Sequence, residues 1–183
     1  MKKIFLFLAM TVSLVANAQD KYLTRNAKVR FDATSSTSPE KIEAINNQGT
    51  SIFIAQTGQY EFSVLMQAFE FEKALMKDHF NENYVETTKF PKAVFKGTIQ
   101  DVAKVNFAKD GKYPVVIKGT MDLHGVKKEV SANGTLTVSG GKVTASSNFK
   151  LVLSDFNVII PNLVNDKIAK EATINVDAAY NKM

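Results

Sequence analysis

Apolar and polar residues alternate along most of the chain. A period of two places successive side chains on opposite faces of a β-strand, so each alternating run predicts a strand with one apolar face. Two shorter apolar segments, 42–45 and 50–55, extend the pattern. The sequence therefore predicts about eight or nine strands, each with an apolar face to bury. The alternating runs are residues 28–33, 59–68, 93–99, 115–123, 130–138, 149–153 and 174–180.

Short turn sequences separate these runs, among them Asn47-Gln48-Gly49, Asp110-Gly111 and Gly140-Gly141. Short strands joined by such turns are typical of a meandering antiparallel sheet. A sheet of this kind hides its apolar faces by closing into a barrel or by stacking as two sheets. We therefore expect an all-β fold, either an antiparallel β-barrel or a β-sandwich with a filled core.

Two segments break the period of two. Residues 72–85 hold Ala74, Leu75 and Met76 among polar groups, which favours a short helix or an ordered loop. Residues 161–168 could form one helical turn. We expect one or two short helices, placed at the ends of the barrel.

The N-terminus has the pattern of a secretory signal. Lys2 and Lys3 precede an apolar run over residues 4–15, and Ala16-Asn17-Ala18 resembles an A-x-A cleavage site. The run is shorter than the roughly 20 residues of a membrane-spanning helix. We expect residues 1–18 to be a signal peptide and residues 19–183 to form one exported domain without stable membrane insertion. The periplasm is the expected location, and secretion to the medium is the alternative.

The positions of the aromatic residues decide between a soluble and a transmembrane barrel. Phe31, Phe62 and Phe149 lie in the middle of apolar faces rather than in girdles at strand ends, and the chain has no Trp. A soluble barrel is therefore expected.

The net charge of +5 is scattered, without a basic stripe interleaved with aromatic residues, so nucleic acid is not an expected partner.

Few residues offer chemistry. His79 and His124 are the only histidines, and cysteine is absent, so no disulfide and no metal site are expected. No G-x-S-x-G nucleophile motif and no glycine-rich phosphate loop occur. The sequence thus predicts no catalytic residues and no cofactor.

Two glycines, Gly119 and Gly134, occupy the apolar faces of predicted strands. Glycine at such a position either permits a bend that closes the sheet or leaves room for a ligand. An eight-stranded barrel is just wide enough to be filled by its own side chains or to hold one small ligand. Small residues on the inner face favour the second interpretation.

Three segments together resemble the YceI-like family of exported lipid-binding proteins. Residues 76–80 and 89–95 are similar to the family's D-x-H-L stretch and its K-[FY]-P-x-[ILVA]-x-F strand, and residues 118–130 resemble its G-x-L-x-[IL]-H-G-V-x-[KR]-x-V hairpin. The tail from Phe149 to the last strand is the third segment. The resemblance implies a lipocalin-like antiparallel barrel of about eight strands around an elongated apolar pocket, with polyisoprenoid lipids as ligands.

We therefore predict a carrier for an isoprenoid-type lipid, such as a polyprenyl or prenylquinone-like molecule, and not an enzyme. His79 is a candidate contact for the lipid head group. An enzyme acting on a small apolar substrate in the same cavity, and a filled β-sandwich with a structural or adhesive role, are the alternatives. The sequence is compatible with a monomer and with a homodimer. The residues expected to line the cavity are Phe62, Val64, Met66, Phe95, Ile117, Gly119, Met121, Gly134, Phe149, Leu151, Ile174 and Val176.

Overall fold

The computed structural model describes residues 19–183, so the predicted signal peptide lies outside the described residues. Most of this part of the chain forms long antiparallel strands. The strands are β1 (Lys21–Thr34), β2 (Glu43–Ile54), β3 (Gln59–Leu65), β4 (Glu70–Phe71), β5 (Lys92–Ile99), β6 (Gly111–Leu123), β7 (Val126–Ser139), β8 (Lys142–Val152) and β9 (Ile168–Lys182).

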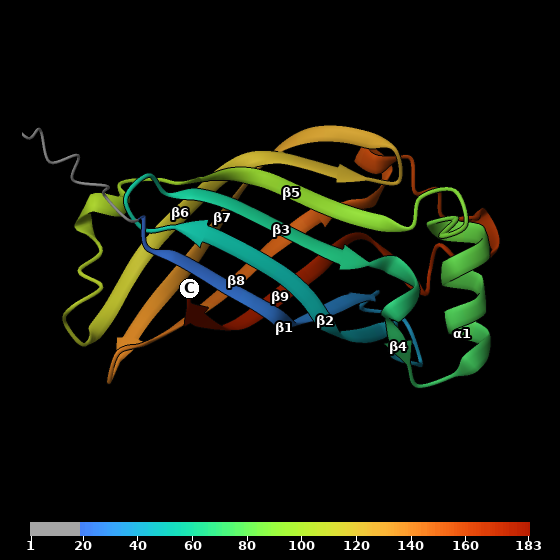
Figure 1. The fold of residues 1–183 in the computed structure, drawn as a ribbon. Coiled ribbons are helices and arrows are strands. Elements are labelled where there is room, and N and C mark those ends of the chain that lie inside the picture. Colours follow the sequence, from blue (N-terminus) through green and yellow to red (C-terminus); the bar gives the residue numbers. More distant parts are fainter. Residues whose placement is uncertain (1–18) are drawn as a thin grey trace, which may run out of the picture.

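The strands form a closed barrel. Their order is β1-β9-β8-β7-β6-β5-β3-β2, and β1 also pairs with β2, which completes the circle. The two-residue strand β4 is attached to β2. Figure 1 shows the barrel as an elongated tube with α1 at one end and the C-terminus at the other. The predicted antiparallel barrel is confirmed, and the β-sandwich alternative is wrong because the sheet closes on itself.

Short helices gather mainly at one end of the tube, which we call the α1 end. They are α1 (Ala74–His79), followed directly by the π-helix η2 (Phe80–Tyr84), and the 3-10 turns η1 (Met66–Ala68), η4 (Leu153–Phe156) and η5 (Asn162–Val164). Helical structure in 72–85 and in 161–168 is therefore confirmed. In the described part of the chain, no helix is both apolar enough and long enough to cross a membrane.

The β2 strand differs from its prediction. Asn47-Gln48-Gly49 was expected to be a turn between two short strands, but β2 runs through it without a break. The pairing of β1 with β2 shifts register around Ala27 and Gly49, so the extra residues form a bulge in place of a turn. The Asn46 side-chain amide donates to the Leu65 carbonyl at 2.9 Å, which ties the bulge to the end of β3.

The opposite end of the barrel, which we call the closed end, is filled by aromatic side chains. A loop carrying the 3-10 turn η3 (Val102–Lys104) lies there, and Phe107 from this loop stacks on Tyr22 with ring centroids 5.4 Å apart. Tyr22 stacks in turn on Phe53 at 4.9 Å. This cluster seals the barrel, so the space inside can open only towards the α1 end or through the wall.

Candidate functional site

An apolar cavity of about 490 Å³ occupies the interior of the barrel. It extends from the aromatic cluster at the closed end to the α1 end, where Met66, Phe69 and Phe80 line it. Its volume is within the roughly 300–1,000 Å³ of ordinary ligand pockets. Eleven of the twelve residues predicted to line a cavity do line it: Phe62, Val64, Met66, Phe95, Ile117, Met121, Gly134, Phe149, Leu151, Ile174 and Val176.

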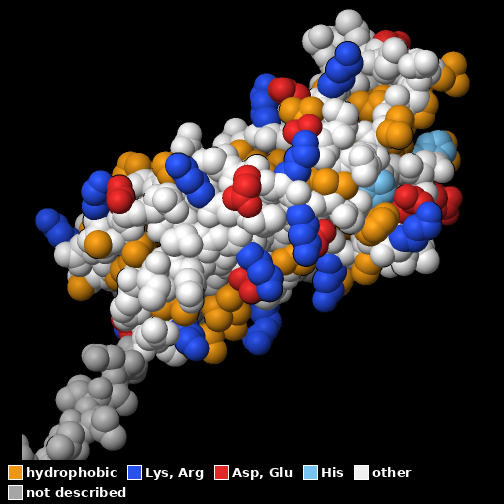
Figure 2. Space-filling model, turned by 90° about the horizontal axis from the view of Figure 1, so that it is seen from above, with side chains coloured by type: hydrophobic (Ala, Val, Ile, Leu, Met, Phe, Trp, Pro, Cys, Tyr) orange, Lys and Arg blue, Asp and Glu red, His pale blue; other side chains and the backbone are white. Residues whose placement is uncertain are grey.

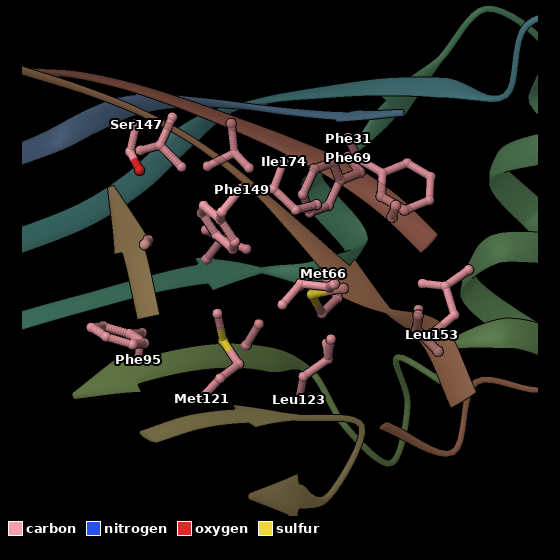
Figure 3. A pocket seen from close by; sticks show the side chains of 18 of the residues that line it. Phe31, Met66, Phe69, Phe95, Met121, Leu123, Ser147, Phe149, Leu153 and Ile174 are labelled. Carbon is pink, nitrogen blue, oxygen red and sulfur yellow. The ribbon is translucent and has the colours of Figure 1, made fainter. Parts of the chain in front are cut away.

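The lining comes from opposite walls of the barrel. Figure 3 shows Phe149 of β8 and Ile174 of β9 across the space from Phe95 of β5 and Met121 of β6. Each of these residues belongs to the apolar set of its alternating strand, so the period of two directs it inward. The result is an elongated space with an almost wholly apolar wall, which suits a hydrocarbon chain.

Gly119 is the exception, and its predicted place in the lining is wrong. It pairs with Gly97 across β5 and β6. A Cβ atom on Gly119 would lie 2.2 Å from the Lys96 carbonyl oxygen and 2.4 Å from the Gly97 Cα. Gly119 therefore permits the close approach of two backbones at a bend in the sheet, which is the structural alternative considered for this glycine.

Buried hydroxyl groups near the closed end were not predicted. The Ser51 and Tyr180 hydroxyls lie 2.9 Å apart, and Tyr60, which lines the cavity, lies beside them. Burial raises the pKa of Tyr60, and burial also raises the pKa of Tyr180. These phenols therefore stay neutral. The group was missed because it joins β2 and β3 to β9, and Ser51 and Tyr180 are 129 residues apart in the sequence.

Charged residues surround the cavity at the α1 end, which we call the mouth. Glu40, Lys73, His79 and Lys167 all line it there. Lys73 donates to the Glu40 carboxylate, and this hydrogen bond, together with the lysine charge, lowers the pKa of Glu40. His79 is exposed at the end of α1. Its predicted contact with a lipid head group stays a prediction.

His124 holds two segments of the α1 end together. Its Nδ1 lies 3.0 Å from the Phe156 carbonyl and its Nε2 lies 3.1 Å from a Glu86 carboxylate oxygen. The side chain is only 9% exposed, and Phe90 packs edge-on against the ring. His124 adopts a φ of 51° in the β6–β7 turn. His124 is thus a turn residue whose imidazole bonds to a backbone carbonyl of η4.

The α1 end shows no arrangement for metal binding. Within residues 19–183, no three side chains of His, Cys, Asp or Glu gather closely enough to hold an ion. The polar groups near His124 are instead occupied with one another, since Glu86 also accepts a hydrogen bond from Lys89. That bond, followed by the one with His124, lowers the pKa of Glu86.

Known proteins resemble this chain in sequence pattern and in fold. A model of the YceI-like domain matches residues 13–180. The fold is similar to a polyisoprenoid binding domain from Saccharophagus degradans, with a TM-score of 0.77 and 12% identity, covering 91% of this chain and 100% of that one. Burkholderia cenocepacia BcnA is similar with a TM-score of 0.67 and 16% identity, covering 85% of this chain and 96% of that one.

The Campylobacter jejuni YceI protein has the same fold at a lower TM-score of 0.54 and 12% identity, covering 100% of this chain and 99% of that one. At identities this low, each likeness shows the architecture alone. A search of curated protein sequences finds no significant match.

Proposed function

The chain belongs to the YceI-like domain family, and from this premise we propose that it is an exported, periplasmic carrier that holds an isoprenoid-type lipid inside its barrel. The observation that carries the proposal is the continuous apolar lining of the cavity. The similarity in fold to a polyisoprenoid binding domain supports it. Ligand contact by the eleven lining residues, and by His79 at the mouth, is part of the same proposal.

The energetics of such a site favour a greasy chain. Removing a CH₂-sized group from water contributes roughly 0.8 kcal/mol, so a 40-carbon chain would nominally gain about 30 kcal/mol. Measured affinities saturate near 20 kcal/mol because binding also restricts the motion of both partners. We expect micromolar to nanomolar dissociation constants for prenyl lipids.

A carrier is favoured over an enzyme because, within residues 19–183, no hydroxyl of the cavity wall is hydrogen-bonded to a His, Asp or Glu side chain that could act as its base. Several polar groups that reach the cavity are engaged, as Lys73 is with Glu40 at the mouth, and Tyr60 lies beside the hydrogen-bonded Ser51 and Tyr180 hydroxyls near the closed end. The neutral phenols of Tyr60 and Tyr180 and the Lys73–Glu40 ion pair stabilise the structure around the cavity. They are not poised to transfer a proton at neutral pH.

Two substitutions at neighbouring positions test the proposal. Ala132 is 8% exposed and lines the cavity, whereas Ser131 is on the outer face of the same strand. Ala132→Phe places a ring in the space that the lipid needs, and Ser131→Phe adds the same ring outside. We expect Ala132→Phe to weaken binding of a fluorescent prenyl probe at least tenfold, while Ser131→Phe binds as the unaltered protein does.

Circular dichroism and thermal unfolding of both variants would show that each is folded at the temperature of the titration. Equal affinities of the two folded variants would contradict the assignment of the cavity as the lipid site. Failure of the unaltered protein to bind prenyl probes of any chain length would contradict the proposed function itself.

A further inference from the structure

Large hydrophobic side chains are exposed mainly at one end of the molecule. Within residues 19–183, six are exposed, and five of them, all except Met183, lie on strand ends, loops or helices of the α1 end. The three most exposed of these five are Leu75 at 64%, Ile159 at 78% and Leu163 at 91%. We call these three the apolar rim. Figure 2 shows hydrophobic side chains beside the histidines at one end of the molecule, with others along the barrel and at the opposite end.

The apolar rim continues the inner surface of the cavity. Leu75 itself lines the cavity, and so do Ile160 and Val164, which are the chain neighbours of Ile159 and Leu163. Apolar side chains therefore reach from the inside of the barrel to solvent, beside the charged residues of the mouth. A single exposed leucine is ordinary, but exposed leucines and isoleucine around the opening of an apolar cavity indicate a binding surface.

The size of the apolar rim favours a lipid surface over a protein. Three aliphatic side chains present on the order of 300 Å² of apolar area, whereas a stable protein interface buries about 800 Å² on each partner. Insertion into a bilayer has no such minimum, because the interface of the membrane adapts to each apolar side chain.

Three lysines near the apolar rim are paired with carboxylates. Lys73 pairs with Glu40 and Lys77 pairs with Glu70, both within the region around α1. Lys41 and Glu43 form a third pair at the start of β2. Lysines paired with carboxylates attract anionic lipid only weakly. Attachment of the apolar rim should therefore be hydrophobic and only weakly sensitive to salt.

We propose that the apolar rim docks on the surface of a lipid bilayer, so that the cavity mouth faces the membrane and the ligand passes between membrane and barrel by direct contact. The inference rests on the proposed function, since it names the surface through which that ligand is loaded and released. Leu75, Ile159 and Leu163 enter the acyl boundary, while the lysines around them remain at the level of the head groups.

The test uses phosphatidylcholine vesicles and the double variant Ile159→Ser/Leu163→Ser. Met183→Ser is the matched control, because Met183 is 69% exposed at the closed end. Flotation measures vesicle binding, and release of a fluorescent prenyl probe to vesicles measures transfer. We expect the double variant to bind vesicles at least tenfold more weakly and to transfer the probe correspondingly more slowly, while Met183→Ser behaves as the unaltered protein does.

The dependence of transfer on vesicle concentration separates two routes. If docking carries the ligand, the transfer rate of the unaltered protein rises with vesicle concentration, and this rise is lost in the double variant. A rate independent of vesicle concentration, or equal vesicle binding by all three proteins, would overturn the proposal. Self-association in analytical ultracentrifugation that is abolished by the double substitution would also overturn it, since the apolar rim would then bind a second copy of the chain.

Binding of the probe in the absence of membranes distinguishes a loss of docking from a loss of lipid binding. The double variant should bind the probe in solution as tightly as the unaltered protein, because neither serine lies inside the cavity. Loss of docking with intact solution binding supports the apolar rim. Absence of solution binding in the unaltered protein would contradict the lipid-carrier function, on which the rim depends.

Discussion

Replacing Gly119 with alanine should damage the fold far more than its size suggests. The added Cβ would lie 2.2 Å from the Lys96 carbonyl oxygen and 2.4 Å from the Gly97 Cα. Normal van der Waals separation is about 3.5 Å, so β5 and β6 would have to move apart by more than about 1 Å. Both obstructing atoms belong to the backbone, which cannot rotate away as a flexible side chain can.

The magnitude follows from the hydrogen bonds that such a separation breaks. Each ladder bond contributes about 1 kcal/mol net, and two or more lie beside the Gly97–Gly119 pair. With the strain that remains, we expect Gly119→Ala to lower the free energy of unfolding by about 2–4 kcal/mol. For a domain of this size, 1 kcal/mol shifts Tm by about 2–4 °C, so the fall should be roughly 5–15 °C.

Gly134→Ala is the control for this experiment. A Cβ at Gly134 would lie 3.0 Å from the Ser146 carbonyl oxygen and 3.6 Å from the Ser147 Cβ, on the cavity side of β7. We expect a change in unfolding free energy of about 1 kcal/mol or less, because alanine also restricts the unfolded chain more than glycine does. Urea unfolding of both ligand-free variants measures the difference. A Gly119→Ala variant as stable as the unaltered protein, yet weakened in lipid binding, would refute the close-approach interpretation.

Three further outcomes are expected. Alanine at both His79 and His124 should leave prenyl binding mostly intact and lower Tm through His124 alone, which loses two partly buried hydrogen bonds; stoichiometric zinc that disappears with these substitutions would argue against this. Tyr180→Phe removes the hydroxyl bonded to Ser51 and should destabilise the ligand-free protein by about 1 kcal/mol in urea unfolding. The pKa of Glu40 is lowered by Lys73, so the ion pair is fully formed above the ordinary carboxylate value of 4.5 and is lost only as the pH falls through the lowered pKa; the prenyl affinity of a His79→Ala variant, which lacks the titratable imidazole at the mouth, should therefore be constant between about pH 5 and pH 8, and a marked loss within that range would contradict the assignment.

Alternation along single strands was sufficient to predict much of the barrel. In β5, the alternation of the sequence assigns Phe95 to the apolar face of the strand. In the structure, its side chain lines the cavity. A shift of one residue would turn every such side chain outward, so the inner face is strongly specified by the pattern. This is why most of the lining residues could be named without coordinates.

Other features depend on contacts that no local pattern carries. The β2 bulge depends on β1, which pairs with β2 on both sides of the extra residues. It also depends on the Asn46 amide, which donates a hydrogen bond to the Leu65 carbonyl of β3. The mouth brings Glu40 and Lys167 to the same cavity from loops far apart in the sequence, which happens only once the barrel closes. The role of Gly119 was predicted wrongly because a glycine on the apolar face of a strand fits two structures. It can leave room for a cavity, or it can let two neighbouring strands approach closely.

Native mass spectrometry of the protein purified from its own source tests the central claim most directly. If the barrel carries a lipid, the protein should show a bound species whose mass is lost on organic extraction and whose fragments differ by isoprene units. The Ala132→Phe variant, produced in the same cells, should carry much less of it. Protein that is folded, free of any extractable lipid and unable to take up a prenyl chain afterwards would contradict the account.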